Sequence, residues 1–473
     1  MASHGDTIFA LSSGRPPAAI AVVRISGPHA GVALEKLMGR VPEPRKAVLA
    51  RVRDPASREI IDEALALWFP GPNSETGEDT AELQLHGGRA VIAAALAALG
   101  KLEGLRLAEP GEFTRRAFEN GRLDLTAVEG LADLVGAETE AQRRQAYRHM
   151  KGLLGDRAET WRKRLIEALA LVEARIDFSD EADVPEELVA PALKIAQGLR
   201  DEIAEALAGA ARGERLRDGL VIAIAGPPNA GKSTLLNAIA RREAAIVSPT
   251  PGTTRDVIEV HLDLGGYPVT LLDTAGIRDS DDPIEQEGVR RARARAGEAD
   301  LVLWVVDLSA DPAAVAKAAE AREIEARLAA ATGPAGPAPS QHGRTVWVVG
   351  NKLDTMDKGS FIINEHEPET SNISFILSAI TGEGMNRFFN SLNHHVGSTF
   401  GGEPALVTRE RHRKALEAAQ KALDRALAEG PGGREDILAE ELRLAARSLG
   451  RLTGRVDVED ILDAIFRDFC IGK

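Results

Sequence analysis

A glycine-containing stretch in the middle of the chain has the pattern of a phosphate-binding loop. Residues 226–234 read GPPNAGKST and match G-x-x-x-x-G-K-[ST] at every fixed position. They lie between a predicted buried strand at 220–225 and an amphipathic helix that begins near Lys232. Backbone N–H groups and the helix N-terminus of such a loop bind phosphate oxygens. We therefore expect Lys232 to contact the β and γ phosphates of a nucleotide and Ser233 to bind Mg²⁺.

Three further stretches follow in the order that a nucleotide-hydrolysing domain requires. An isolated loop of this pattern can also be a turn that binds nothing. LLDTAG at 271–276 ends a predicted strand with Asp273, which can hold Mg²⁺ through water, and the N–H of Gly276 is available for the γ-phosphate. VVGNKLD at 348–354 and ILSAI at 376–380 end two more predicted strands. Four matched stretches in order predict a P-loop nucleotide site.

The choice of base follows from Asp354 at the end of the VVGNKLD stretch. A carboxylate accepts hydrogen bonds from N1–H and the amino group of guanine, whereas adenine would leave the buried charge without partners. Backbone N–H groups at 378–380 can reach the guanine carbonyl oxygen. We therefore predict GTP as the ligand. The predicted GTP-binding residues are Asn229, Ala230, Gly231, Lys232, Ser233, Thr234, Ser248, Thr253, Thr254, Asp273, Thr274, Ala275, Gly276, Asn351, Lys352, Asp354, Ser378, Ala379 and Ile380.

The residues that would arrange the attacking water differ from those of signalling GTPases. Ile277 stands where such enzymes often carry a water-orienting glutamine. In the stretch SPTPGTTRD at 248–256, Thr254 is suited to close on Mg²⁺. Carbonyl groups of this stretch, together with Asn229, could hold a monovalent cation beside the β and γ phosphates. The alternative reading of Asn229 as an ordinary polar loop residue is equally good on the sequence alone.

Composition restricts the class of protein. The 473 residues allow about three domains, and the single cysteine, Cys470, excludes internal disulfides. No apolar stretch approaches the ~20 residues of a membrane span, and the first residues do not resemble a secretion signal, so we expect a cytoplasmic protein. A net charge of −14 argues against a broad electrostatic grip on nucleic acid. The basic run at 290–296 is better read as a solvated helix face. For Cys470, a packing residue is at least as good a reading as a reactive thiolate.

Periodicity explains why the phosphate loop lies so far from both ends of the chain. The first part mixes short alternating strands, at 19–26 and 81–88, with one Ala-rich helix at 89–102. Helical patterns follow on both sides of the nucleotide domain, at 125–152, 161–178, 192–210, 409–430 and 434–454. We interpret this as a split helical domain with an inserted P-loop GTPase domain.

The two ends of the helical part carry local signals. Thr126 and Glu129 have the spacing of a capping box. A last helix after Asp457 places apolar side chains on one face: Val458, Ile461, Leu462, Ile465, Phe466 and Phe469. The Ala/Pro-rich stretch at 331–344 predicts a loop inside the inserted domain. The predicted domains are an N-terminal α+β domain at 1–120, a helical domain in two halves at 121–218 and 399–473, and a Ras-like α/β GTPase domain at 219–398.

Several of these stretches together resemble the MnmE (TrmE) family of tRNA modification GTPases. The resemblance rests on GPPNAGKST, PGTTRD, DTAGIR with IEQEGVRRA, NKLD, the block PGPNSETGEDTAELQLHGG at 70–88 and the terminal FCIGK. It covers nearly the whole chain and is weakest at about 310–343 and 355–400. The G motifs occur in many GTPases, whereas the N-terminal block and the terminal pentapeptide are specific to this family.

The resemblance implies a homodimer whose GTPase domains meet and whose hydrolysis is stimulated by K⁺. It places K⁺ on Asn229, Ser248, Thr250 and Thr253, and Mg²⁺ on Ser233 and Thr254. Glu285 would arrange the attacking water, and Lys232 and Thr254 would complete the catalytic set. Without the resemblance Glu285 would read as one surface acid among many.

The resemblance also implies a tetrahydrofolate site in the N-terminal domain, for the 5-formyl or methylene form. Arg24, Glu82, Arg122 and Lys473 occupy the corresponding positions. Arg122 stands where a lysine is often found, which changes the donor geometry, and Glu75 stands where an aromatic is often found, which could loosen ring stacking.

The activity implied is installation of an aminomethyl or carboxymethylaminomethyl group at C5 of the wobble uridine, position 34, of certain tRNAs. A flavin- and NADH-dependent partner would supply the redox chemistry, in a heterotetramer or larger complex. No G-x-G-x-x-G fingerprint follows a strand here, in agreement with a flavin held elsewhere.

Two other classes share the G motifs. A ribosome-assembly GTPase should carry an RNA module in a basic setting, and a membrane-remodelling or structural GTPase should carry a basic amphipathic face. The sequence shows neither feature.

Overall fold

The computed structural model describes most of the chain. The residues described are 5–177, 188–242, 259–273, 299–310, 315, 345–356, 373–401, 404–430, 434–456, 459–467, 469 and 472. They form two compact units: the first comprises Met1–Val135, Tyr147–Ala204 and Lys414–Lys473, and the second comprises Gly136–Ala146 and Glu205–Arg413. Two sheets and many helices make this a multidomain α/β and α protein, as the sequence predicts. Among the described helices, none combines the length and apolar character needed to cross a membrane.

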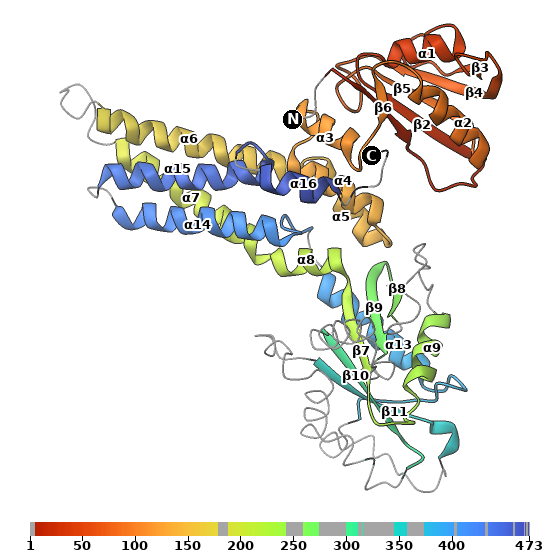
Figure 1. Ribbon diagram of the computed structural model, residues 1–473. Helices are drawn as coiled ribbons and strands as arrows, with labels where there is room; N and C mark the ends of the chain where they lie inside the picture. Colours follow the sequence, from red (N-terminus) through yellow and green to blue (C-terminus); the bar gives the residue numbers. More distant parts are fainter. Residues whose placement is uncertain are drawn as a thin grey trace, which may run out of the picture. The chain divides into compact units, whose positions relative to one another are not determined.

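The first unit opens with a six-stranded sheet in the order β3-β4-β5-β2-β1-β6 (Figure 1). Its strands are β1 (Thr7–Leu11), β2 (Ile20–Ser26), β3 (Val48–Arg53), β4 (Ile60–Phe69), β5 (Thr80–His86) and β6 (Leu105–Leu107). Neighbours pair antiparallel except β1 with β6, which pair parallel. Along β2, Ala21, Val23 and Ile25 are buried and alternate with less buried residues. This period of two places Arg24 on the face opposite the core.

Three helices accompany this sheet, where the sequence predicted only one. The predicted Ala-rich helix is α2 (Arg89–Gly100), which packs with α1 (Ala30–Met38) on the buried face of the sheet. The helix α3 (Glu112–Glu119) follows β6. The prediction of one helix was wrong because α1 and α3 span only nine and eight residues. Helices this short depend on tertiary packing more than on their own periodic pattern.

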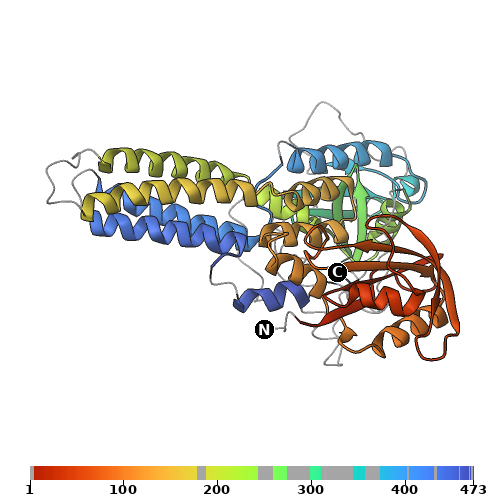
Figure 2. The ribbon, with the colours of Figure 1, turned by 90° about the horizontal axis from the view of Figure 1, so that it is seen from above.

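Four long helices of the first unit lie side by side in a bundle (Figures 1 and 2). They are α6 (Gly155–Asp177), α7 (Val189–Ala208), α14 (Glu410–Glu429) and α15 (Glu435–Thr453). Helix α6 buries Trp161, Leu165 and Val172, and α15 buries Leu442 and Leu449. The helices before and after the second unit in the sequence therefore share one apolar core.

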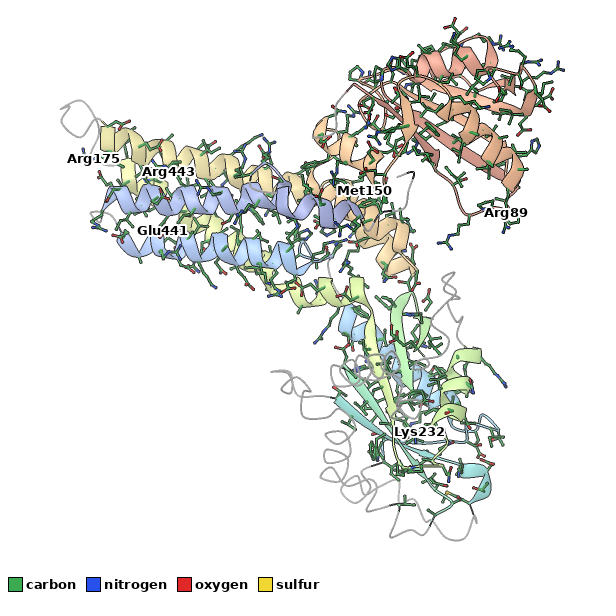
Figure 3. All side chains as sticks on the ribbon, in the orientation of Figure 1. Arg89, Met150, Arg175, Lys232, Glu441 and Arg443 are labelled. Carbon is green, nitrogen blue, oxygen red and sulfur yellow. The ribbon has the colours of Figure 1, made fainter. Side chains whose placement is uncertain are left out.

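Ion pairs join each helix of the bundle to the next. Glu202 of α7 accepts from the Trp161 indole at 2.8 Å. Among the interhelical ion pairs, with their N–O distances, are Arg164–Glu202 at 2.6 Å, Arg200–Asp424 at 3.4 Å, Arg425–Glu441 at 2.7 Å and Arg443–Glu173 at 2.7 Å. Glu441 and Arg443 are labelled in Figure 3. Each partly exposed ion pair of this kind contributes little stability. The burial of apolar side chains therefore supplies most of the free energy that stabilises the bundle.

Two local predictions at the start of the helical part were wrong. The pattern at 125–152 forms two helices, α4 (Leu125–Gly136) and α5 (Glu140–Met150), rather than one. Thr126 does not cap α4 through a capping box. Asp124 is the N-cap residue instead. Its Oδ1 accepts hydrogen bonds from the N–H of Ala127 at 2.9 Å and from the Thr126 hydroxyl at 2.7 Å. Aspartate is among the preferred N-cap residues, and it stands one position before the helix.

The C-terminal helix α16 (Glu459–Arg467) packs on the start of the helical part. Phe466 and Phe469 are buried in one cluster with Val128, as the predicted apolar face requires. The side chains of Val458 and Ile461 lie outside the described residues. Beyond the helix, Gly472 has a φ of 98°, and a Cβ atom there would lie 2.1 Å from the Leu11 carbonyl oxygen. Gly472 therefore approaches the backbone at the end of β1 so closely that only glycine fits there.

The second unit contains a six-stranded sheet in the order β12-β11-β10-β7-β9-β8. Its elements are α8 (Ala210–Asp218), β7 (Leu220–Ala225), α9 (Lys232–Arg242), β8 (Glu259–Leu264), β9 (Tyr267–Asp273), β10 (Leu301–Asp307), β11 (Thr345–Asn351), the 3₁₀ turn η3 (Leu353–Thr355), β12 (Phe375–Ile376) and α13 (Met385–Phe400). All strand pairs are parallel except β8 with β9. The central strands are almost wholly buried, which explains their continuous apolar sequences.

A buried charge network holds α3 in the N-terminal part of the first unit. Arg116 is only 4% exposed, and its guanidinium contacts Asp6, Glu78 and Glu112 at 2.8, 3.1 and 3.1 Å. Arg106 also pairs with Asp6 and Glu112. Burial raises the pKa of both Asp6 and Glu112, but hydrogen bonds from the two arginines outweigh it and leave each pKa below its ordinary value.

Replacement of Arg116 by methionine should destabilise the protein by about 3–5 kcal/mol at pH 7, because the carboxylate of Glu78 loses its arginine partner and Asp6 and Glu112 each lose one of two. The ordinary pKa values of Asp6 and Glu112 are 3.8 and 4.5, and both are lowered by folding. Their contribution to stability is therefore present above those values and is lost as the pH falls through and below them. Urea unfolding at several pH values should show a smaller acid loss in Arg116→Met than in the unaltered protein.

Arg51→Met is the matched control. Arg51 pairs with Glu63 at 2.8 Å, but both side chains are more than half exposed. Its unfolding free energy should stay within about 1 kcal/mol of the original. Identical pH profiles for Arg116→Met and the unaltered protein would contradict the assignment of the acid-sensitive stability to this network.

Candidate functional site

The carboxyl ends of the parallel strands in the second unit bring the predicted nucleotide-binding stretches to one edge of the sheet. Strand β7 lies between β10 and β9 in a parallel arrangement, so Ala225 and Asp273 end adjacent strands. Asp307 and Asn351 are paired at the ends of β10 and β11. The strand order reverses at β7, and ligands of open α/β sheets bind at such a point.

The phosphate loop follows β7 and leads into α9, whose first residue is Lys232 (Figure 3). Lys232 is 9% exposed, and its ammonium donates to the carbonyl oxygens of Gly226 at 3.0 Å and Pro227 at 2.8 Å. Burial lowers the pKa of Lys232, and the charge of Asp273 partly opposes this. The loop thus holds a cation beside the N-terminus of α9, where backbone N–H groups and the helix dipole also favour phosphate.

Ser233 and Asp273 form a pair that suits Mg²⁺. The Ser233 hydroxyl donates to Asp273 Oδ2 at 2.8 Å, and Asp273 is only 2% exposed. Mg²⁺ usually keeps several waters and binds one or two protein oxygens together with substrate phosphates. A hydroxyl and a carboxylate next to the phosphate loop fit that requirement.

Asn351 joins the phosphate loop to the loop after β12. Its Nδ2 donates to the Ala230 carbonyl at 3.1 Å, and its Oδ1 accepts from the N–H of Ala379 at 3.0 Å. Asn351 is 2% exposed. Gly231 allows this approach, because its φ is 91° and a Cβ atom there would lie 2.2 Å from Asn351 Nδ2. One amide group therefore fixes the spacing between the phosphate end and the base end of the site.

The base end is formed by η3 and the loop after β12. Asp354 is exposed, and its carboxylate accepts a hydrogen bond from the Ser378 hydroxyl. Ser378 also accepts from the N–H of Thr381 at 3.1 Å. Ile380 is 76% exposed, as expected of a residue whose backbone faces a ligand edge. The carboxylate is thus oriented by a neighbouring hydroxyl and still reachable from solvent.

One residue of the site, Asp307, was missed by sequence reasoning. Lys352, which has a φ of 67°, pairs with Asp307 at 2.5 Å. Burial raises the pKa of Asp307, but the hydrogen bonds from Lys352 and Ser309 lower it overall. The available signal was the position of Asp307, since it ends the apolar run LVLWVVD at the same edge as the other motifs.

The structure places the described predicted GTP-binding residues at the carboxyl edge of the parallel sheet, in the last residues of β9 and β11, the first turn of α9, η3 and the connecting loops. These residues are Asn229, Ala230, Gly231, Lys232, Ser233, Thr234, Asp273, Asn351, Lys352, Asp354, Ser378, Ala379 and Ile380. Other predicted features lie outside the described residues: Ser248, Thr250, Thr253, Thr254, Thr274, Ala275, Gly276, Ile277, Glu285, Cys470, Lys473, the basic run at 290–296 and the loop at 331–344.

A second candidate site is a pocket of about 330 Å³ in the N-terminal sheet domain. Its lining residues are Arg45, Phe69, Asn73, Ser74, Glu75, Thr80, Glu82 and Arg122. Two of the predicted folate-binding residues, Glu82 and Arg122, line it directly. Arg24 lies opposite Glu82 in the pairing of β2 with β5, and its Nε donates to Glu82 at 3.0 Å.

Glu75 has a role that the sequence did not predict. Its carboxylate pairs with Arg24, which also pairs with Glu82 at 2.9 Å. Arg24 is 16% exposed at its side chain and lies 5.9 Å from the Phe113 ring centroid. Glu75 thus adds a second carboxylate to the lining of the pocket.

Comparisons with known proteins cover both units. A family model described as the GTP-binding protein TrmE N-terminus matches residues 7–122, and one described as the MnmE helical domain matches residues 125–470. The chain is 56% identical over 473 residues to the tRNA modification GTPase MnmE of Rhodopseudomonas palustris strain BisB18, with 100% of both chains covered. It is 54% identical over 478 residues to the same-named protein of Bradyrhizobium sp. strain ORS 278, again with 100% of both chains covered.

Replacement of Gly231 by alanine should lower affinity for a fluorescent GTP analogue by about tenfold or more. The new Cβ would displace Asn351 and force a left-handed backbone on a non-glycine residue, which costs about 1–3 kcal/mol. Gly397→Ala in α13 is the control, because no atom lies within 4 Å of its added Cβ. Equal affinities for the Gly231→Ala and Gly397→Ala variants would show that the close contact with Asn351 does not shape the site.

Proposed function

Because the chain belongs to the MnmE (TrmE) family of tRNA modification GTPases, we propose that it binds and hydrolyses GTP at the edge of the parallel sheet and uses this cycle in tRNA modification. The observation that carries the proposal is that Lys232, at the start of α9, lies at the same edge of the parallel sheet as Asp273 and Asn351, which end β9 and β11. Asp354 lies at the same edge, three residues beyond the end of β11.

The described residues would have distinct roles in phosphoryl transfer. Lys232 and the N-terminus of α9 would neutralise charge on the β and γ phosphates. Ser233 and Asp273 would hold Mg²⁺, the former directly and the latter through water, and the bound ion would neutralise the developing charge. We assign Thr254 as the second protein ligand of Mg²⁺ and Glu285 as the residue that arranges the attacking water. These two assignments rest on the family pattern.

Guanine selection falls to Asp354. Its carboxylate would accept from N1–H and the 2-amino group of guanine, while Ser378 keeps it oriented. The backbone at Ala379 and Ile380 would meet the guanine carbonyl. Adenine offers an acceptor at N1 and has no 2-amino group, so it would leave the carboxylate without partners.

We extend the proposal to K⁺ at the phosphate loop. Asn229 would hold the ion together with Ser248, Thr250 and Thr253, largely through main-chain oxygens. Asn229 has a φ of 62° and is exposed on the loop that carries Lys232, which supports a ligand role without requiring it. A cation there would stabilise charge that develops between the β and γ phosphates.

The N-terminal pocket supports binding of a tetrahydrofolate, in the 5-formyl or methylene form, as the one-carbon donor. Carboxylates at Glu75 and Glu82 suit the N–H edge of a pterin, and arginines suit its anionic tail. Lys473 would contribute from the terminal segment, whose Gly472 packs on Leu11. With a flavin- and NADH-dependent partner in a heterotetramer or larger complex, a homodimer of this chain would modify C5 of the wobble uridine.

Exchange of Asp354 for asparagine should reverse the base preference. The amide would donate to the 2-oxo group of xanthine, whereas it cannot accept from both N–H groups of guanine. GTP affinity should fall by about 100-fold or more, and xanthosine triphosphate should become a substrate. Steady-state hydrolysis of both nucleotides checks this.

Asp218→Asn provides the control, because Asp218 is an exposed carboxylate paired only with its neighbour Arg217 among the described residues. Its kinetics should match those of the unaltered protein with both nucleotides. An Asp354→Asn variant that still prefers GTP would contradict the base assignment.

The K⁺ proposal predicts faster GTP hydrolysis in KCl than in NaCl at equal ionic strength. Asn229→Ala should remove most of that difference, by about tenfold or more, because one ion ligand is lost. GTP affinity in NaCl should stay unchanged. Equal rates of the unaltered protein in both salts would eliminate the K⁺ site.

A further inference from the structure

The arginines at the N-terminal pocket differ in whether they form ion pairs with carboxylates. Arg24 is bound by two carboxylates, those of Glu75 and Glu82. Arg45 and Arg122 line the same pocket, and neither forms an ion pair with a carboxylate in the part of the chain that the structure describes. The pocket therefore contains two carboxylates that share one arginine, and two arginines whose positive charge is not balanced by a described carboxylate.

Arg45 is held in place by contacts that leave its charge uncompensated. Its Nη2 donates to the Asn73 carbonyl, and its guanidinium lies 5.6 Å from the Phe69 ring centroid. Its backbone N–H donates to the Trp68 carbonyl at 2.8 Å. The residue also adopts a φ of 62°, which is uncommon for a side chain other than glycine, asparagine or aspartate. A guanidinium has five N–H donors, and the carbonyl of Asn73 uses only part of this capacity.

Arg24 is a poorer candidate for an incoming anion. Its Nε and Nη2 contact Glu82 at 3.0 and 2.9 Å, and its Nη1 contacts Glu75. A ligand carboxylate on Arg24 would have to displace one of these acids and leave a partly buried charge unpaired. The oxygens of Glu75 and Glu82 instead offer acceptors to N–H groups of a ligand.

We propose that Arg45 is a further ligand-binding residue of this pocket and that, with Arg122, it binds the carboxylates of the glutamyl tail. The inference rests on the tetrahydrofolate binding proposed above. A glutamyl tail carries an α and a γ carboxylate, which matches two arginines, and guanidinium binds carboxylate with two parallel hydrogen bonds. The pterin edge then faces Glu75 and Glu82.

Isothermal titration with two probes tests this assignment. The probes are 5-formyl-tetrahydrofolate and a derivative whose two tail carboxylates are converted to amides. Arg45→Gln should weaken binding of the acid by about 10- to 100-fold, the range for hydrogen bonds to a charged group, and leave binding of the diamide unchanged. Arg45→Lys should recover part of the loss, because it restores the charge but not the paired donors.

Arg51→Gln serves as the matched control, since Arg51 lies on β3 outside the pocket and pairs with Glu63. It should bind both probes as the unaltered protein does. Unchanged binding of the acid to Arg45→Gln would overturn the inference while leaving the folate site intact, and so would an equal loss for acid and diamide. Failure of the unaltered protein to bind the acid would instead overturn the folate site itself, and with it the role of Arg45.

Discussion

Packing of α15 against α6 is the contact on which the first unit depends. The two helices are separated in sequence by the whole nucleotide domain, yet they share a core that includes Trp161, Leu165, Leu442 and Leu449. Burial of each such side chain contributes about 1.5–3 kcal/mol. The bundle can therefore form only when both halves of the chain have met. An inserted domain is tolerated in such a host because its two junctions belong to helices that are already held together.

The sequence predicted best those parts in which backbone geometry or ligand chemistry dictates the residue type. The phosphate loop at 226–234 is one such case, since it needs glycine at Gly231 for the approach of Asn351. The strand ends at Asp273 and Asn351 are another, because parallel pairing brings them to one edge. The family match agrees with this reading and does not support the ribosome-assembly or membrane alternatives. The exact domain boundaries stay predictions.

Features that depend on distant neighbours could not be read from the sequence. The helix α1 buries four residues at helical spacing, but it spans only nine residues, and a helix this short forms through its packing on the sheet. The continuous helical pattern at 125–152 gave no sign that the helix is interrupted between α4 and α5. The N-cap of α4 is Asp124 rather than Thr126, two possible caps that lie close together in the sequence. From the sequence, Glu75 was recognised only as a residue that stands where the family often has an aromatic side chain. Its pairing with Arg24 required the loop between β4 and β5 to fold over β2.

We propose that GTP turnover in the second unit serves the modification of tRNA. Mass spectrometry of tRNA nucleosides from a strain lacking this chain tests it most directly, with complementation by the unaltered protein and by Lys232→Ala at equal abundance. The unaltered protein should restore the C5 modification of the wobble uridine, and Lys232→Ala should not. A fully modified wobble uridine in the deletion strain, or full restoration by Lys232→Ala, would contradict the claim.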